Sequence, residues 1–171
     1  NCTIADNVAT DPSNSYGGGI GVREESQFSA PMDSLLLVNC VLYGNTAPDI
    51  FMQSIGTPKA LSRYSLVAGG VPADVTNGTG NIDTDPLFVD AAAGDYHLQS
   101  GSPCIDTGHP AYLDEDDTLS DMGVYGGGKF GTTAVYGTIP TTTWTAANSP
   151  YYVVGQCTVA TGNMLSIDSG V

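Results

Sequence analysis

A short phrase that the chain repeats constrains its fold more than any other feature of the sequence. NCTIADN begins at Asn1, NCVLYGN at Asn39 and a degenerate third copy, YSLVAGG, at Tyr64. Spacings of this length are too long for a hairpin meander and suit one turn of a solenoid, in which each coil buries its inner face by stacking on its neighbours. The longer first spacing leaves room for an excursion around residues 11–16 or 23–32. The repeat therefore predicts coils stacked as parallel strands about 4.8 Å apart.

Each copy is a predicted strand whose side chains alternate between two faces. One face carries a small residue followed by an aliphatic one in every copy: Cys2 and Ile4, Cys40 and Leu42, Ser65 and Val67. The opposite face carries Thr3, Val41 and Leu66. The first set is the predicted inner face of the coils.

Corners between strands are predicted where each copy ends. The last residues of the three quoted phrases are Asn7, Asn45 and Gly70, which belong to the types that tolerate left-handed backbone. The run GGGI at Gly17 to Ile20 predicts a tight corner that leads into another strand. We expect little or no helix, because no window shows sustained apolar spacing at i, i+3, i+4 and i+7.

An apolar block follows the repeats and predicts a lid. IDTDPLFVDAAAGDYHLQSGSPCIDTG runs from Ile82 to Gly108, and DMGVYGG runs from Asp121 to Gly127. The last coil of a parallel solenoid exposes its core and unpaired backbone groups, so it needs such a cover. Residues 129–143 are a predicted extended connector. Residues 144–171 are predicted to form two strands that lack a complete core of their own.

These patterns resemble a known family. GGGI together with IADN and LYGN resembles the short repeats of right-handed parallel β-helix surface proteins, including the polymorphic outer-membrane protein type. The apolar block is similar to the segment that closes such helices, and the residues from Trp144 onward resemble the opening of a further module. The resemblance implies an all-β chain: β-helix coils in residues 1–81, a C-terminal cap with an acidic loop in 82–128, a connector in 129–143 and the first strands of a second β module in 144–171.

Charge excludes two classes of partner. The chain has 18 Asp and Glu against 4 Lys and Arg, a formal net charge of -14. Nucleic acids and anionic membranes are bound through clustered Lys and Arg, which this chain does not have. No apolar run approaches the length of about 18 residues that spans a membrane. We expect no nucleic-acid partner and no membrane insertion.

Because the sequence begins in mid-pattern, we also expect a piece of a longer secreted protein.

The acidic loop LDEDDTLSD is the predicted metal site. It carries four candidate ligands, Asp114, Asp116, Asp117 and Asp121. Calcium takes 6 to 8 oxygen ligands from flexible loops, and oxygens at alternating positions suit it. The spacing is not that of an EF-hand. Calcium is therefore the candidate cofactor, and the alternative is a solvated acidic loop without a metal.

Paired carboxylates also raise a glycosidase hypothesis. The candidate acids are Asp83, Asp85, Asp90, Asp95 and Asp106. They stand in TDP, VD, GD and IDTG, which are turn signatures in which Asp accepts hydrogen bonds from nearby backbone. No basic residue lies among them, as lyase chemistry would require. His97 is predicted to be a surface or cap residue and His109 a loop residue, so we predict that the chain is not an enzyme.

Four cysteines leave their redox state open. Cys2, Cys40, Cys104 and Cys157 contain no CxxC pair, so a zinc site is not indicated. The repeat places Cys2 and Cys40 at equivalent positions, where their Cα atoms would lie within disulfide range, but parallel stacking does not guarantee the required torsion. NCT and NGT at Asn1 and Asn77 are glycan acceptors only in a eukaryotic secreted protein.

The resemblance implies a structural and adhesive role in a large extracellular or cell-surface protein. The expected partners are neighbouring modules of the same protein, copies of itself and surface glycans. The incomplete module from Trp144 predicts end-to-end assembly into a filament by strand addition. The competing hypothesis is a carbohydrate-binding or polysaccharide-degrading domain. Its aromatic platform would come from the tyrosines Tyr16, Tyr43, Tyr112, Tyr125, Tyr136, Tyr151 and Tyr152, and the alternative is that these rings pack under loops.

Overall fold

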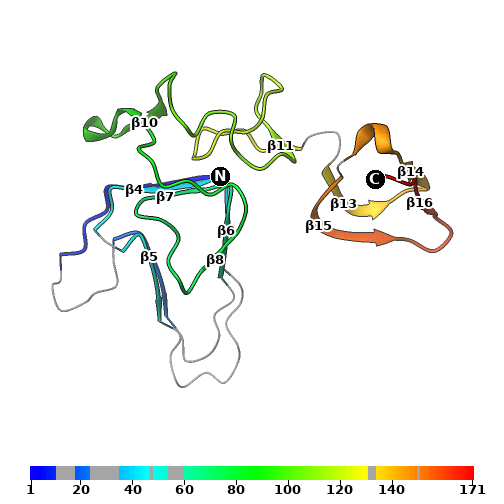
Figure 1. Cartoon of the computed structure of the whole chain (residues 1–171), viewed down its shortest axis with the longest axis horizontal. Helices are drawn as coiled ribbons and strands as arrows, with labels where there is room; N and C mark the ends of the chain where they lie inside the picture. The colour runs from blue at the N-terminus through cyan, green and yellow to red at the C-terminus, as the bar shows by residue number, and fades with distance from the viewer. Residues whose placement is uncertain (11–17, 24–34, 47, 54–59, 131–133, 150) are drawn as a thin grey trace.

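The computed structural model describes residues 1–10, 18–23, 35–46, 48–53, 60–130, 134–149 and 151–171 (Figure 1). These residues form short β-strands and two single turns of 3-10 helix, η1 and η2. The predicted all-β class with almost no helix is therefore confirmed. The excursions expected around residues 11–16 and 23–32 lie outside the described residues, apart from Arg23.

The three copies of the repeated phrase pair with one another. They form β1 (Cys2–Ala5), β4 (Cys40–Tyr43) and β7 (Leu66–Val67), which make one parallel sheet in the order β1-β4-β7. Its register joins Cys2 with Cys40, Thr3 with Val41, Ile4 with Leu42, and Val41 with Leu66. The alignment read from the sequence is the pairing register of this sheet.

Two further parallel sheets repeat this arrangement. β2 (Ile20–Arg23) pairs with β5 (Ile50–Gln53), and β3 (Leu35–Val38) pairs with β6 (Ala60–Arg63), which pairs with β8 (Thr76–Asn77). The chain visits the three sheets in turn, through β1, β2 and β3 and then β4, β5 and β6. Each strand thus returns parallel to its predecessor, in the same sheet.

A hydrophobic core lies between the three sheets. Its buried members are Leu37, Cys40, Leu42, Ile50, Ala60, Val67 and Val75. The predicted inner face is confirmed for Cys40, Leu42 and Val67, and Ile4 packs against the same core. Leu42, in the central strand of the first sheet, has no exposed surface.

The left-handed corners lie one residue earlier than predicted in the first two copies. Positive φ occurs at Asp6 (55°) and Gly44 (70°), not at Asn7 and Asn45, whereas the prediction is confirmed at Gly70 (88°). Asn7 and Asn45 stack on each other instead, and the backbone N–H and the side-chain Nδ2 of Asn7 both donate to Asn45 Oδ1, at 3.1 and 2.9 Å. The amide side chains hold the segments that follow β1 and β4 together just after the turn.

The GGGI corner packs against neighbouring backbone. A Cβ atom on Gly18 would overlap the carbonyl oxygen of Asn7, and one on Gly19 would overlap that of Asp49. The backbone can approach this closely only without a side chain. The corner leads into β2, as the sequence predicts.

Residues 82–127, the cap segment, cover the outer face of the first sheet. Val41 and Leu66 point to that face and are fully buried against Cys104 and Met122. Figure 1 shows the cap segment running along the same side as β4 and β7. The sequence predicts a lid over the end of a solenoid, and the structure places this segment over the outer face of the first sheet, because the outward side chains of β4 and β7 are as apolar as the inward ones. Ile82 alone extends the sheet, bridging to Leu66.

The cap segment is mostly turns and short antiparallel pairs. β9 (Phe88–Asp90) is followed by η1 (Ala91–Ala93) and pairs with β10 (Asp95–Leu98). β11 (Tyr112–Leu113) pairs with β12 (Lys129–Phe130). Its side-chain packing, rather than regular sheet structure, joins it to the first sheet.

The C-terminal strands pair differently from the prediction. β13 (Ala134–Ile139) pairs in parallel with β15 (Tyr152–Val159), and β14 (Thr142–Trp144), which leads into the 3-10 turn η2 (Ala146–Asn148), pairs in parallel with β16 (Leu165–Ile167). The expected connector, residues 129–143, thus supplies partner strands for residues 144–171. We refer to residues 134–171 as the C-terminal module.

Replacing Leu42 by alanine should test the inner core. Removing a fully buried leucine loses transfer free energy and leaves a cavity, which costs about 3 kcal/mol of unfolding free energy. Leu36, which is 52% exposed in the neighbouring sheet, is the matched control, and Leu36→Ala should change stability by about 0.5 kcal/mol or less. Urea unfolding monitored by circular dichroism measures both, and equal losses would contradict the assignment of the core.

Candidate functional site

The acidic loop closes on itself. Asp114 N–H donates to the Thr118 carbonyl at 3.0 Å, and Leu113 bridges to Leu119 across the loop. Asp116 Oδ1 accepts from the backbone N–H and the hydroxyl of Thr118, at 3.0 and 2.7 Å. Asp117 adopts left-handed backbone with φ of 68°. Asp116 therefore stabilises the turn itself.

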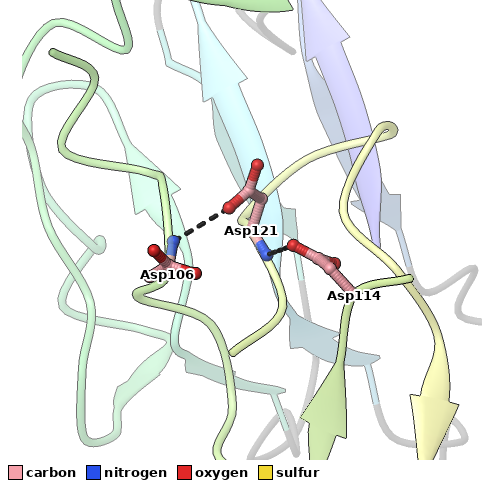
Figure 2. A group of neighbouring side chains, drawn as sticks. All are labelled: Asp106, Asp114 and Asp121. Carbon is pink, nitrogen blue, oxygen red and sulfur yellow. Dashed lines mark hydrogen bonds between the residues drawn. The ribbon is translucent and has the colours of Figure 1, made fainter. Parts of the chain in front are cut away.

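Three carboxylates gather beside this loop. Oxygens of Asp106, Asp114 and Asp121 lie within 4.8 Å of one another (Figure 2). Asp121 Oδ1 accepts from the Asp106 N–H at 2.8 Å, and Asp114 Oδ2 accepts from the Asp121 N–H at 3.1 Å. Asp114 Oδ1 also accepts from the Gly127 N–H. We call these three residues the carboxylate cluster.

The cluster includes only half of the predicted ligand set. Asp114 and Asp121 belong to it, whereas Asp116 and Asp117 do not. The third member, Asp106, is a residue that the sequence indicates only as a candidate catalytic acid. It joins because its own N–H bonds to Asp121, a contact between distant turns of the cap segment that sequence spacing does not encode.

The electrostatics of the cluster favour either a proton or a cation. Burial raises the pKa of Asp121, and the charges of Asp114, Asp106 and Asp116 raise it further. The backbone N–H from Asp106 offsets part of this effect. Three carboxylate oxygens form a donor set of the kind that hard cations such as calcium bind, with the remaining oxygens supplied by water or carbonyls. The residues present therefore fit a calcium ion.

Three of the remaining candidate acids accept hydrogen bonds from their own turns. Asp85 Oδ1 accepts from the Leu87 N–H at 2.9 Å, and Asp90 Oδ1 accepts from the Ala93 N–H at 3.1 Å. Asp95 Oδ1 accepts from the His97 N–H at 3.1 Å and lies 2.6 Å from its Nδ1, which helps to lower the pKa of Asp95. These carboxylates serve the turns, as the sequence indicates.

Asp83 has a different setting from the other acids. It lines a small open pocket of about 130 Å³ together with Gly70, Val71, Asn77, Asn81 and Ile82. This pocket lies between the third copy of the repeated phrase and the start of the cap segment. It is well below the size of about 300 Å³ at which small-molecule sites begin, so it does not indicate a substrate pocket.

The asparagine that begins the first two copies of the repeated phrase anchors the cap segment, a role that the sequence does not reveal. Asn1 Nδ2 donates to the carbonyls of Gly126 and Gly127, at 2.8 and 2.6 Å. The equivalent Asn39, fully buried with φ of 54°, accepts at Oδ1 from the His109 N–H at 2.6 Å. Both asparagines also donate to the Ser120 hydroxyl, each at 3.3 Å. The asparagine of the repeated phrase therefore binds the outer layer.

His109 is the centre of an aromatic cluster. Its ring packs on Tyr64 at 4.8 Å, on Tyr112 at 5.4 Å and on Tyr152 of β15 at 5.5 Å. Its Nδ1 accepts from the Ala111 N–H at 3.1 Å. The histidine thus links the third copy of the repeated phrase, the cap segment and the C-terminal module, a role that its position in a loop does not indicate.

Most of the tyrosines proposed for a sugar platform make ring contacts with other residues. Tyr43 packs on Phe88 and Tyr151 stacks on Trp144, in addition to the two tyrosines on His109. Tyr125 is 52% exposed and stacks on His97 at 3.7 Å, and Tyr136 is 54% exposed. Tyr16 lies outside the described residues. Among these ring contacts of the described residues, only the stack of Tyr125 on His97 includes a largely exposed tyrosine.

None of the four cysteines forms a disulfide in the structure. Cys2 is exposed, whereas Cys40 and Cys104 are buried. Burial raises the pKa of Cys104 to about 11, so this thiol is inert as a nucleophile.

Comparisons with protein-family models, with curated proteins and with solved structures found no match to the chain. In the described part of the chain, no helix has the length and apolar character needed to cross a membrane.

Protonation of His109 should destabilise the fold. Burial, together with the charge of Arg63, lowers the pKa of His109. The unfolded chain therefore binds the proton more readily, and stability is lost as the pH falls below the usual histidine value of about 6.5. We expect the melting temperature to fall by about 2–4 °C more in the wild type than in His109→Gln between about pH 7 and pH 5.5.

Thermal melts over a pH series measure this difference. His97→Gln is the control, because the His97 side chain is 60% exposed and makes none of the contacts that join the layers. A wild-type pH profile that matches that of His109→Gln would contradict the role of His109.

Proposed function

We propose that the chain is a structural and adhesive segment of a large extracellular or cell-surface protein, built on coils of a right-handed parallel β-helix. The observation that carries this proposal is the set of three parallel sheets, which the chain visits in turn and in register. Parallel strands joined by crossovers are right-handed in nearly all proteins, which supports the handedness.

The same arrangement supports a mechanical role. The first two coils bond each other along three sheets, the third continues two of these sheets, and all share one core, so bending or stretching the stack would break many contacts together. The cap segment adds a second layer along one side, attached through Asn1 and Asn39. A stiff, laterally reinforced rod suits a stalk or surface layer. The proposal assigns no catalytic residues, since Asp85, Asp90 and Asp95 stabilise turns.

The C-terminal module supports assembly with neighbouring modules or with further copies. It exposes apolar side chains on its strands and turns: Val153, Val159, Met164, Ile167 and Val171. Each of its two parallel sheets has two strands. Among the described residues, each of these strands therefore leaves one edge unpaired and open to another strand. Addition of strands from another module or copy would cover both the edges and the apolar groups.

Self-association should depend on this module. Light scattering on a size-exclusion column, over a series of concentrations, should show oligomers of the full chain. Replacing Met164 and Ile167, which are 63% and 59% exposed, by lysine should shift the chain toward monomer. Val8→Lys is the matched control, because Val8 is 73% exposed in the coils. A monomer at every concentration would count against end-to-end assembly.

We also propose that calcium binds the carboxylate cluster and stiffens the cap segment. Calcium at about 100 times its dissociation constant would stabilise the fold by about 2.7 kcal/mol, seen as a higher melting temperature that a chelator reverses. Asp121→Asn should abolish this response. Without calcium, the same variant should be more stable than the wild type by about 0.5 kcal/mol, since it removes a crowded charge while keeping an acceptor for the Asp106 N–H.

Asp116→Asn is the control, because Asp116 lies outside the cluster and serves its own turn. It should keep the calcium response. Equal melting temperatures with calcium and with chelator would show that the cluster is held by backbone N–H groups alone, and would remove calcium from the proposal while leaving the structural role in place.

The second candidate function is carbohydrate binding. The exposed stack of Tyr125 on His97, beside the Asp95 carboxylate, offers a ring face and a hydrogen-bond acceptor of the kind that sugars use. The same melts with a panel of acidic and neutral polysaccharides distinguish the two functions. A glycan-dependent shift that Tyr125→Ala removes would favour a lectin, and release of reducing sugars would favour a hydrolase.

A further inference from the structure

Cys2 and Cys40 lie side by side on adjacent strands of the first sheet. They are direct register partners of the parallel strands β1 and β4. Neighbouring strands lie about 4.8 Å apart, which falls within the Cα separation of about 4.4–6.8 Å found in disulfides. Because they are partners in register, their side chains leave the sheet on the same face. The two thiols are therefore neighbours on the inner side of the sheet.

The surroundings of Cys40 leave Cys2 as its one thiol neighbour among the described residues. In the next coil, the same stack is continued by Ser65, whose hydroxyl accepts from the Cys40 N–H at 3.1 Å and donates to the Arg63 carbonyl at 3.0 Å. The Cys40 thiol is buried and donates to the Val38 carbonyl at 3.3 Å. Cys104 belongs to the separate core on the outer face of the sheet. Cys40 is thus enclosed by Ser65 on one side and Cys2 on the other.

The two thiols differ in access. Cys2 is exposed and lies in the strand at the edge of the sheet, whereas Cys40 is buried in the central strand. An oxidant from solution therefore meets Cys2 first, and Cys40 is positioned to react second. This combination of an accessible thiol and a buried resolving thiol is the arrangement expected of a redox pair.

We propose that Cys2 and Cys40 form a reversible disulfide that ties β1 covalently to β4. With a low-molecular-weight disulfide as the oxidant, the Cys2 thiolate attacks one sulfur, the oxidant's S–S bond breaks and one thiolate leaves. Burial raises the pKa of the Cys40 thiol, so the second step is the slower one: the Cys40 thiol loses its proton and attacks the Cys2 sulfur, and the second thiolate leaves. The protein loses two protons and two electrons, and the oxidant becomes two thiols.

The parallel geometry makes this bond easy to reduce. Disulfides bring Cβ atoms to about 3.5–4.5 Å, slightly less than the strand separation, so β1 must shift toward β4 when the bond forms. Among the described residues, β1 has a neighbouring strand on one side only, which allows such a shift. Some strain remains in the product, and strained disulfides have less negative reduction potentials than ordinary structural ones. The bond would form in an oxidising compartment and open under mild reduction.

Oxidation with glutathione disulfide tests the proposal on the full chain. Intact mass should fall by two hydrogen atoms, and the number of cysteines that can be alkylated after denaturation should fall from four to two. Digestion should yield one crosslinked peptide containing Cys2 and Cys40. The melting temperature should rise by about 5 °C, since the bond closes a long loop, and reduced glutathione should reverse all of these changes.

Cys40→Ser is the matched variant, because Ser65 shows that serine fits the same stack in the next coil. It should stop at a glutathione adduct on Cys2, without the rise in melting temperature. Cys2→Ser should take up neither an adduct nor an internal bond at Cys40. A wild-type chain that also stops at the Cys2 adduct, or a crosslink that includes Cys104 or Cys157, would overturn the proposal.

Discussion

Strand β4 is buried on both of its faces, and the rest of the structure follows from that constraint. Cys40 and Leu42 fill the core between the three sheets, while Val41, between them in sequence, is fully buried on the outside. A strand of this kind needs a layer on each side, as the strands of parallel sheets usually do. The strands of the other two parallel sheets provide the inner layer, and the cap segment provides the outer one.

The side-chain amides of Asn1 and Asn39 decide where that outer layer lies. Apolar contact with Val41 and Leu66 would tolerate many placements of the cap segment, because hydrophobic contact is non-directional. The amides of Asn1 and Asn39 are directional, and both reach the Ser120 hydroxyl. Asn39 is fully buried, and a buried amide without partners would cost about 1–3 kcal/mol, so only placements that satisfy Asn39 are stable. Apolar burial thus drives the attachment, and the asparagines set its register.

The sequence predicted the parts of the fold that depend on local repetition. The register of β1, β4 and β7, the inward face of Leu42 and Val67 and the corner before β2 all follow from the repeated phrase. It did not predict what covers Val41, because nothing in an alternating pattern tells whether the second face meets water or another layer. It also missed Asp106, which joins the carboxylate cluster through a contact between distant turns. The strands in residues 134–144 were missed because each finds its partner later in the chain and carries no repeated phrase to mark it.

Three buried or half-buried groups make the stability of this fold respond to acid in opposite directions. Burial lowers the pKa of His109, so acidification through the histidine range favours the unfolded chain. Burial raises the pKa of Asp49 and Asp121, so protonation of these carboxyls at lower pH favours the folded chain. The aromatic cluster around His109 should therefore weaken first as the pH falls, while the carboxylate cluster loses its internal repulsion. As the pH falls, the fold would therefore loosen first where the C-terminal module meets the cap segment, at the contact between His109 and Tyr152, and would keep the core of β4 intact.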